Sequence, residues 1–164
     1  MRMDEAVLTV RVAARNDESE WLRMRKLLWP NHTHDELLYE LQFYLGIIEP
    51  PYSPIVGPPE IAFVADRGDG NLGGFVEVST HSRAEGCSTS PVGYLEGWWV
   101  DDDLRLHGIG RMLVNAAEKW ARGLGYTEMA SDTDDYRPWS VKAHQKLGYS
   151  IVSIGREILF RKLL

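Results

Sequence analysis

The chain has 164 residues, a length typical of one domain, with 18 lysines and arginines against 24 aspartates and glutamates. The formal net charge of -6 disfavours a nucleic-acid-binding surface, which is normally basic, and is compatible with a cationic substrate. A hydrophobic share of 44% excludes a disordered chain. We therefore expect a single globular domain over residues 1–164.

Cysteine content and hydropathy bear on the cellular compartment. The only cysteine, Cys87, can form neither an internal disulfide nor a cysteine-rich zinc site, so we expect a reducing compartment, the cytoplasm, and no metal. No run of about 18 apolar residues is present, and no apolar segment follows the first five residues. Neither a membrane span nor a signal peptide is therefore expected.

The N-terminal third is predicted to be one strand and two helices. Alternating β-branched residues indicate a strand at 7–13. Apolar residues at helical spacing predict helices at 17–28 and 33–48, each opened by a pair that resembles a capping box. Pro30 ends the first helix.

A proline-rich loop and a hairpin follow. Five prolines between Glu49 and Pro59 predict an irregular loop and not a linker between two cores. Residues 61–65 and 72–79 are predicted strands, and the turn between them is rich in residues that tolerate a positive φ.

The C-terminal half alternates strands and helices. A polar loop at 80–91 precedes the most aromatic strand, and the longest helix keeps a three-to-four spacing for four turns. The predicted elements are strands at 94–100, 128–131, 150–154 and 157–160, and helices at 109–124 and 138–147. The complete order, β-α-α-β-β-β-α-β-α-β-β, predicts an α/β fold with a mixed sheet covered by helices.

The loop before the longest helix carries an anion-binding pattern. Arg105, Gly108 and Gly110 form Arg-x-x-Gly-x-Gly at the predicted helix N-terminus. Glycines there let backbone N–H groups approach a ligand, and the helix dipole favours an anion such as a pyrophosphate. A plain tight turn is the alternative. A Rossmann site is disfavoured because the third glycine of that fingerprint is missing.

This loop resembles the acetyl-CoA pyrophosphate loop of the GNAT N-acetyltransferase superfamily. Further blocks are similar to one subgroup, the aminoglycoside 6′-N-acetyltransferases: Leu28-Trp29-Pro30-x-His32, Gly86-Cys87-x-x-Ser90-Pro91-Val92-x-Tyr94-Leu95-Glu96-Gly97, Glu128 to Thr133, Lys142-x-His144-Gln145-x-Leu147-Gly148-Tyr149, and Phe160-Arg161-Lys162. The resemblance implies the GNAT fold, a mixed, mostly antiparallel sheet flanked by helices. In the GNAT fold, the strand that ends here at Val100 separates from the strand that ends near Ser131.

The resemblance also implies acetyl-CoA as the cosubstrate, with its pantetheine amides pairing with the opened strand edge. The implied cofactor-binding residues are Trp98, Trp99, Val100, Arg105, Leu106, His107, Gly108, Ile109, Gly110, Arg111 and Arg137. Arg137 stands where the superfamily often has an asparagine, and an arginine there would contact a phosphate. Trp98 and Trp99 should point to opposite faces of the sheet.

Three residues are candidates for substrate binding. Glu96 lies in an apolar strand, where a solvated edge position is the simplest explanation, and the resemblance implies ammonium binding and general-base catalysis. Asp132 alone indicates a turn, whereas the resemblance places it in the aminoglycoside site. Trp29 is either core or a stacking wall for a sugar ring.

His144 is the candidate acid. It falls where many superfamily members place a tyrosine that protonates the departing thiolate, and histidine can serve as an acid near neutral pH. A core histidine is the alternative, and Tyr149 and Tyr136 are other candidate acids.

The implied reaction is direct transfer of acetyl from acetyl-CoA to the 6′-amine of an aminoglycoside, which would cause antibiotic resistance. Similar enzymes are often homodimers, so we expect one here. A GNAT enzyme acting on a polyamine or a protein amine, and a non-catalytic acetyl-CoA-binding regulator, remain alternatives. The presence of both Glu96 and Asp132 favours catalysis.

Overall fold

The computed structural model describes residues 8–49, 59–134 and 137–164, and the strands in these ranges form one seven-stranded sheet. Its order is β1-β2-β3-β4-β5-β7-β6, and all neighbours are antiparallel except β4 and β5. The strands are β1 (Thr9–Val12), β2 (Ile61–Asp66), β3 (Leu72–His81), β4 (Val92–Val100), β5 (Glu128–Asp134), β6 (Ser150–Ile154) and β7 (Glu157–Leu163). The predicted mixed, mostly antiparallel sheet is confirmed. The predicted proline-rich loop lies mostly outside the described residues.

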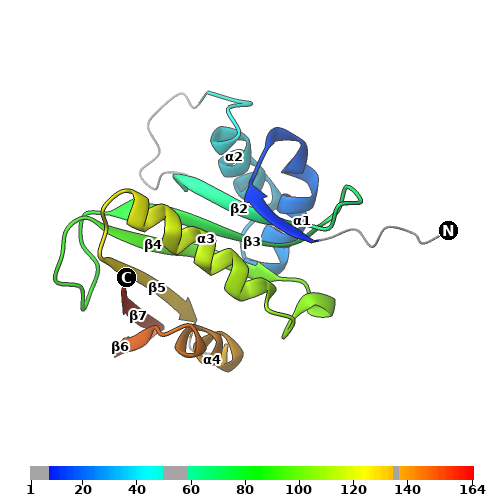
Figure 1. The fold of residues 1–164 in the computed structure, drawn as a ribbon. Helices are drawn as coiled ribbons and strands as arrows, with labels where there is room; N and C mark the ends of the chain where they lie inside the picture. The colour runs from blue at the N-terminus through cyan, green and yellow to red at the C-terminus, as the bar shows by residue number, and fades with distance from the viewer. Residues whose placement is uncertain (1–7, 50–58, 135–136) are drawn as a thin grey trace.

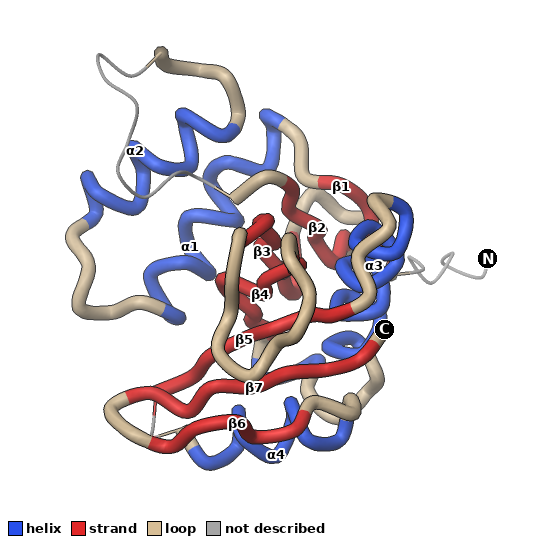
Figure 2. The backbone as a smooth tube through the Cα atoms, turned by 90° about the vertical axis from the view of Figure 1, so that its left-hand side faces the viewer, coloured by secondary structure: helices blue, strands red, loops and turns tan. Residues whose placement is uncertain are grey.

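Helices cover both faces of the sheet (Figure 1). The helix α3 crosses one face, and the antiparallel pair α1 and α2 covers the other, so each face has its own apolar core. The helices are α1 (Glu18–Leu28), α2 (His34–Tyr44), α3 (Ile109–Gly123) and α4 (Pro138–Lys146). Figure 2 shows β5, β7 and β6 side by side, with α4 next to β6. Among the described helices, none is both long and apolar enough for a membrane span.

One of the two predicted capping boxes is confirmed. At the start of α2, the Glu36 N–H donates to Thr33 Oγ1 at 3.2 Å, and the Glu36 carboxylate accepts from the Thr33 N–H at 2.8 Å. The pair predicted at Asp17 and Glu20 is wrong. Asp17 makes no side-chain cap hydrogen bond, because its carboxylate accepts instead from the Arg11 guanidinium at 2.7 Å.

Several strands extend beyond their predicted ends, and two of these extensions matter for the site. β3 continues to His81, which lies opposite Val92, and β5 continues to Asp134, which lies opposite Glu157. In each case pairing with the neighbouring strand holds residues that the composition alone placed in a loop or turn. The extensions bring His81 and Asp132 onto the sheet.

The strands β4 and β5 pair over only three residues and then part (Figure 1). Gly93 to Leu95 face Met129 to Ser131. Immediately after this contact β4 carries a bulge: Val78 is opposite Leu95 and Glu77 is opposite Gly97, so Glu96 has no partner on β3. Bulges bend a strand and re-aim a side chain. The sheet therefore opens at the residue that the sequence analysis singled out as a base.

Candidate active site

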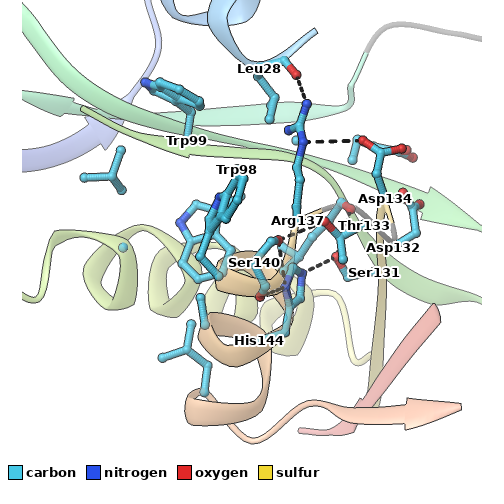
Figure 3. A pocket seen from close by; sticks show the side chains of 18 of the residues that line it. Leu28, Trp98, Trp99, Ser131, Asp132, Thr133, Asp134, Arg137, Ser140 and His144 are labelled. Atoms are coloured by element: carbon cyan, nitrogen blue, oxygen red, sulfur yellow. Dashed lines mark hydrogen bonds and ion pairs between the residues drawn. The ribbon is translucent and has the colours of Figure 1, made fainter. Parts of the chain in front are cut away.

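A cavity of about 670 Å³ opens where β4 and β5 part (Figure 3). Its walls come from the end of α1, the second half of β4, the N-terminus of α3, and β5 with α4. Of the predicted site residues, all line the cavity except His107 and Ile109. His107 lies on the exposed side of the loop, and the Ile109 side chain is buried in the core under α3.

The end of the cavity beside α3 is built to hold an anion. Gly108 precedes α3 with a φ of 85°, and Leu106 has a φ of 65°, so the loop doubles back just before the helix. No side chain caps α3, which leaves the N–H groups of its first turn for a ligand. Arg105 and Arg111 add positive charge at the same end of the cavity.

The two tryptophans of β4 support this loop from opposite faces. A Cβ on Gly110 would lie 2.8 Å from the Trp98 ring, so only glycine allows the helix to approach so closely. Trp98 packs with the α3 core and Trp99 with the α1–α2 core. The predicted opposite orientation of the two side chains is confirmed.

Backbone groups of β4 face the opened edge. The Asp101 N–H donates to the Gly73 carbonyl at 2.9 Å, in register with the β3–β4 ladder. Because residues in an antiparallel ladder alternate in the direction of their hydrogen bonds, Trp99 turns its N–H and C=O groups toward β3, whereas Trp98 and Val100 turn theirs toward the cleft. The Val100 carbonyl already accepts from Arg105 Nε at 2.9 Å. This edge suits a ligand that carries amides.

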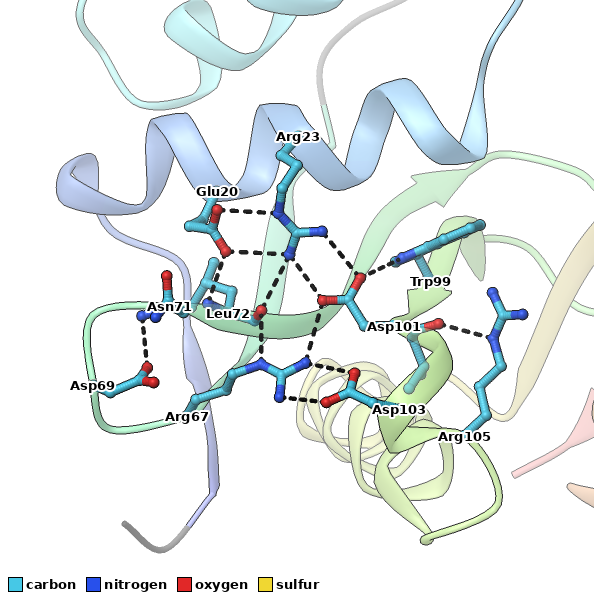
Figure 4. A network of polar contacts seen from close by, with 11 residues as sticks. Glu20, Arg23, Arg67, Asp69, Asn71, Leu72, Trp99, Asp101, Asp103 and Arg105 are labelled. Carbon is cyan, nitrogen blue, oxygen red and sulfur yellow. Dashed lines mark hydrogen bonds and ion pairs between the residues drawn. The ribbon is translucent and has the colours of Figure 1, made fainter.

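An ion-pair network anchors the base of the loop (Figure 4). Asp101 pairs with Arg23 at 2.8 Å and with Arg67 at 3.3 Å, and Arg67 also pairs with Asp103 at 2.8 Å. Burial raises the pKa of Asp101, but the hydrogen bonds from Arg23 and from the Trp99 indole outweigh it and hold that pKa below its ordinary value. The network ties the loop to α1 and to the β2–β3 turn.

The opposite end of the cavity gathers carboxylates. Glu96 from β4 and Asp132 and Asp134 from β5 all line it. The Tyr94 hydroxyl donates to Asp132 at 2.5 Å. Burial raises the pKa of Asp132, an effect that Tyr94 opposes and Asp134 reinforces. A cationic ligand here would relieve the repulsion between the carboxylates.

Arg137 bridges two walls of the cavity (Figure 3). Its guanidinium donates to the Leu28 carbonyl at 2.7 Å and lies 3.5 Å from the Asp134 carboxylate. The side chain is therefore directed toward α1 and the carboxylate end. Its predicted contact with a cofactor phosphate stays a prediction.

Trp29 forms a wall next to the bulge. A Cβ on Gly97 would lie 2.6 Å from the Trp29 ring, so the ring lies against the β4 backbone. The Arg25 guanidinium stands 4.9 Å from the ring centroid and is itself fixed by the buried Glu77 at 2.9 Å. Trp29 is thus held in position and still lines the cavity.

His144 lies at the floor of the cavity (Figure 3). Its ring stacks on Phe160 at 4.3 Å, and Nδ1 lies 2.8 Å from the Ser140 carbonyl, so Nδ1 carries the proton. Nε2 then accepts a hydrogen bond from the Ser131 hydroxyl at 2.9 Å. Burial lowers the pKa of His144 to about 4, so the imidazole is neutral at pH 7.

The other two candidate acids, Tyr149 and Tyr136, are not among the described residues that line the cavity. Tyr149 donates to Glu118 at 3.2 Å in the core and does not line the cavity, and Tyr136 lies outside the described residues. In the described ranges, no group of three His, Cys, Asp or Glu side chains could hold a metal. The sequence analysis did not single out Ser131, whose hydroxyl bonds His144, or His81, whose ring hydrogen-bonds Glu96. Ser131 lies within a quoted block, but His81 lay in a predicted loop and carried no signal.

Comparison with known proteins decides the family. Residues 21–149 match the acetyltransferase (GNAT) family. The chain belongs to the GNAT family. A GNAT protein from Klebsiella aerogenes, aminoglycoside N(6')-acetyltransferase type 1, is 40% identical over 162 residues, which cover 99% of this chain and 100% of that protein. A protein of the same name from Salmonella typhimurium is 32% identical and covers 94% of this chain and 99% of its own length.

Solved GNAT structures share the fold. Aminoglycoside N-acetyltransferase AAC(6')-Iy in complex with CoA superposes with a TM-score of 0.78 at 29% identity, covering 94% of this chain and 95% of that chain. The same enzyme with the bisubstrate analog CoA-S-monomethyl-acetylneamine gives a TM-score of 0.77 at 31% identity, covering 91% and 95%. The predicted family and fold are confirmed.

The cavity fits the acetyl-CoA that GNAT enzymes use. The uncapped N-terminus of α3 behind Gly108 suits a pyrophosphate, and the opened edge at Trp98 and Val100 suits the amides of a pantetheine arm. The two ends of the cavity therefore differ in charge, with the cofactor end basic and the far end acidic.

Proposed function

We propose that the protein transfers the acetyl group of acetyl-CoA to the 6′-amine of aminoglycosides, as a single domain. The observation that carries the proposal is one continuous cavity that joins an anion-holding loop to a cluster of carboxylates. It occurs in a chain that is 40% identical over 162 residues to an aminoglycoside N(6')-acetyltransferase.

The charge of the far end matches the substrate. Aminoglycosides carry several ammonium groups, and Glu96, Asp132 and Asp134 focus a negative field on that end. The Trp29 ring supplies a flat apolar face for the C–H groups of a sugar. Substrate binding therefore depends on the acidic end, and cofactor binding on the loop at the other end.

Glu96 is the proposed base. An ammonium has no lone pair, so one proton must leave the 6′-nitrogen before it can attack the thioester carbonyl. Glu96 takes that proton directly or through a water, and the neutral nitrogen then forms the amide bond while the carbon–sulfur bond breaks. CoA departs as a thiolate, which takes up the second proton released from the nitrogen and leaves as the thiol. The cleft-facing N–H groups of Trp98 and Val100 stabilise the negative oxygen that develops on the carbonyl.

His144 stays a predicted participant in the protonation of the departing thiolate. With a pKa of about 4, roughly one molecule in a thousand carries the imidazolium at pH 7. The imidazole also holds Ser131 at the cavity wall, because its Nε2 accepts a hydrogen bond from the Ser131 hydroxyl. We therefore propose that His144 acts by positioning Ser131. An unchanged kcat in His144→Asn would contradict any role in the reaction.

The test is CoA-thiol release with kanamycin or tobramycin, compared with spermidine and a lysine-containing peptide. Rapid release with the aminoglycosides alone supports the proposal, and activity confined to spermidine or the peptide assigns the other amine substrates. Acetyl-CoA binding without turnover of any amine identifies a non-catalytic regulator. An aminoglycoside with a 6′-hydroxyl in place of the 6′-amine must remain unmodified.

Three further properties belong to the same proposal. Acetylation removes a charge and a hydrogen-bond donor from the drug, so expression in a susceptible bacterium should raise the inhibitory concentration of kanamycin.

The need for acetyl-CoA and the single cysteine support a cytoplasmic location, which cell fractionation tests. A homodimer is part of the proposal because enzymes of the resembling subgroup are often dimers, and light scattering in solution tests it.

A further inference from the structure

We propose that His81 is a positioning residue that fixes the carboxylate of Glu96 toward the substrate, an inference that rests on Glu96 being the base of the proposed acetyl transfer. His81 is the last residue of β3, and its side chain is 37% exposed. It does not line the cavity itself. It acts on the reaction only through Glu96.

The contact between His81 and Glu96 gives the two carboxylate oxygens of Glu96 different environments. Nε2 of His81 hydrogen-bonds Oε1 of Glu96. Among the described residues, the hydrogen bonds of Glu96 involve Oε1 alone, and Glu96 lines the cavity. Oε2 is therefore the oxygen that can meet a substrate ammonium, while Oε1 serves as the anchor.

The imidazole is itself held by a stack. The His81 ring lies on the Tyr94 ring with centroids 4.1 Å apart and an interplanar angle of 12°. The Tyr94 hydroxyl in turn donates to Asp132 at 2.5 Å. His81 thus links the two proposed substrate carboxylates, Glu96 by a hydrogen bond and Asp132 through the tyrosine.

Glu96 needs such an anchor for two reasons. It occupies the bulge, where β3 offers it no backbone partner, and a long glutamate side chain must give up rotamer freedom to hold one position. Asp132 and Asp134 line the same end of the cavity, and their like charge pushes the Glu96 carboxylate away from them. A donor on the β3 side fixes the side chain in one position and stabilises its negative charge against this repulsion.

Two substitutions separate the hydrogen bond from the stack. His81→Phe keeps a ring against Tyr94 but has no N–H to donate, whereas His81→Gln keeps a donor near the position of Nε2 but loses the ring. We expect His81→Phe to lower kcat with kanamycin by about tenfold or more, because a misplaced base loses near-attack geometry. His81→Gln should restore most of that loss. The KM for acetyl-CoA should change by less than about twofold in both.

Controls keep the outcome interpretable. His34→Phe, at the exposed start of α2, should leave kcat unchanged, and thermal melting should show that every variant folds. His81→Ala, which removes donor and ring together, should lose at least as much kcat as His81→Phe. A wild-type kcat in His81→Phe, or a greater loss in His81→Gln than in His81→Phe, overturns the proposal.

The proposed acetyl transfer with Glu96 as the base is contradicted by different results from those that contradict the role of His81. If the wild-type protein acetylates no aminoglycoside, or if Glu96→Gln keeps full activity, the base assignment falls and the His81 inference falls with it. If Glu96→Gln is impaired while His81→Phe is not, Glu96 remains the base and only the positioning role of His81 is wrong.

Discussion

The buried imidazole of His144 should make the protein lose stability in mild acid. The folded state holds this histidine neutral because its ring is buried against Phe160, and the hydrogen bond that Nδ1 donates to the Ser140 carbonyl opposes this effect only in part. Burial lowers its pKa from 6.5 to about 4. The unfolded chain therefore binds a proton between these two values that the folded protein does not bind.

The sign and size follow from that difference. A folded-state pKa below the unfolded one contributes stability that is fully present above pH 6.5 and is lost as the pH falls toward 4. The gap corresponds to about 3 kcal/mol. That is a large part of the ~5–15 kcal/mol by which a domain of this size is stable.

Urea unfolding followed by tryptophan fluorescence, at half-unit steps from pH 7.5 to pH 4.5, measures this loss. The free energy of unfolding of the wild type should fall steeply below pH 6.5, and that of His144→Asn should fall much less. His34→Asn, which removes an exposed histidine, is the matched control and should keep the wild-type slope. Parallel curves for the wild type and His144→Asn would refute the reasoning.

Four other substitutions test separate parts of the structure. Asp132→Ala should raise the aminoglycoside KM strongly and the acetyl-CoA KM little in steady-state assays; equal effects on both would remove Asp132 from the substrate site. Gly108→Val should abolish acetyl-CoA binding by calorimetry, because a β-branched residue is strained at a φ of 85°, whereas Gly108→Asn should keep most of the affinity. Asp101→Asn removes the charge that Arg23 and Arg67 share, although Glu20 and Asp103 remain as their partners, and should cost about 1 kcal/mol in thermal unfolding while raising the acetyl-CoA KM; an unchanged KM would show that the network does not hold the loop. Glu128 has a pKa of about 2, because hydrogen bonds from Thr89, Arg161 and Ser88 outweigh the effect of burial, so the stability it contributes is present above pH 4.5 and lost as the pH falls to 2. Glu128→Gln should lack that acid transition in circular dichroism, and an identical transition would contradict the assignment.

Much of the fold could be predicted from local signals. The helix α3 keeps its apolar spacing for four turns and ends at Gly123, one residue before the predicted end. The box at Thr33 marks the start of α2 because its two partners are three residues apart and need no tertiary contact. Asp17 shows the limit of such signals, since Arg11 competes for its carboxylate and the cap is never made.

The sequence predicted the site residues whose side chains belong to recognisable sequence blocks. It did not predict the features that depend on how β3 and β4 pair. Glu96, Asp132 and Trp29 were found from the resemblance, and all three line the cavity. The bulge at Glu96 could not be found, because it depends on the register between β3 and β4. His81 was missed for the same reason: its neighbours in sequence are polar, and only pairing with β4 extends β3 far enough to bring it to Glu96.

The bulge explains how one strand serves both ends of the cavity. Before Glu96, β4 is paired on both sides and can present only side chains to a ligand. Beyond Glu96, β5 no longer pairs with β4, and the N–H and C=O groups of Trp98 and Val100 are turned to the cleft. Glu96, the proposed base, and Trp98, the first of the backbone positions proposed to hold the acetyl donor, are therefore two residues apart on one strand. Without the bulge, the pairing of β3 with the second half of β4 would shift by one residue and turn the backbone groups of Trp98 and Val100 toward β3, so the place of Glu96 and the cleft-facing backbone depend on the same register.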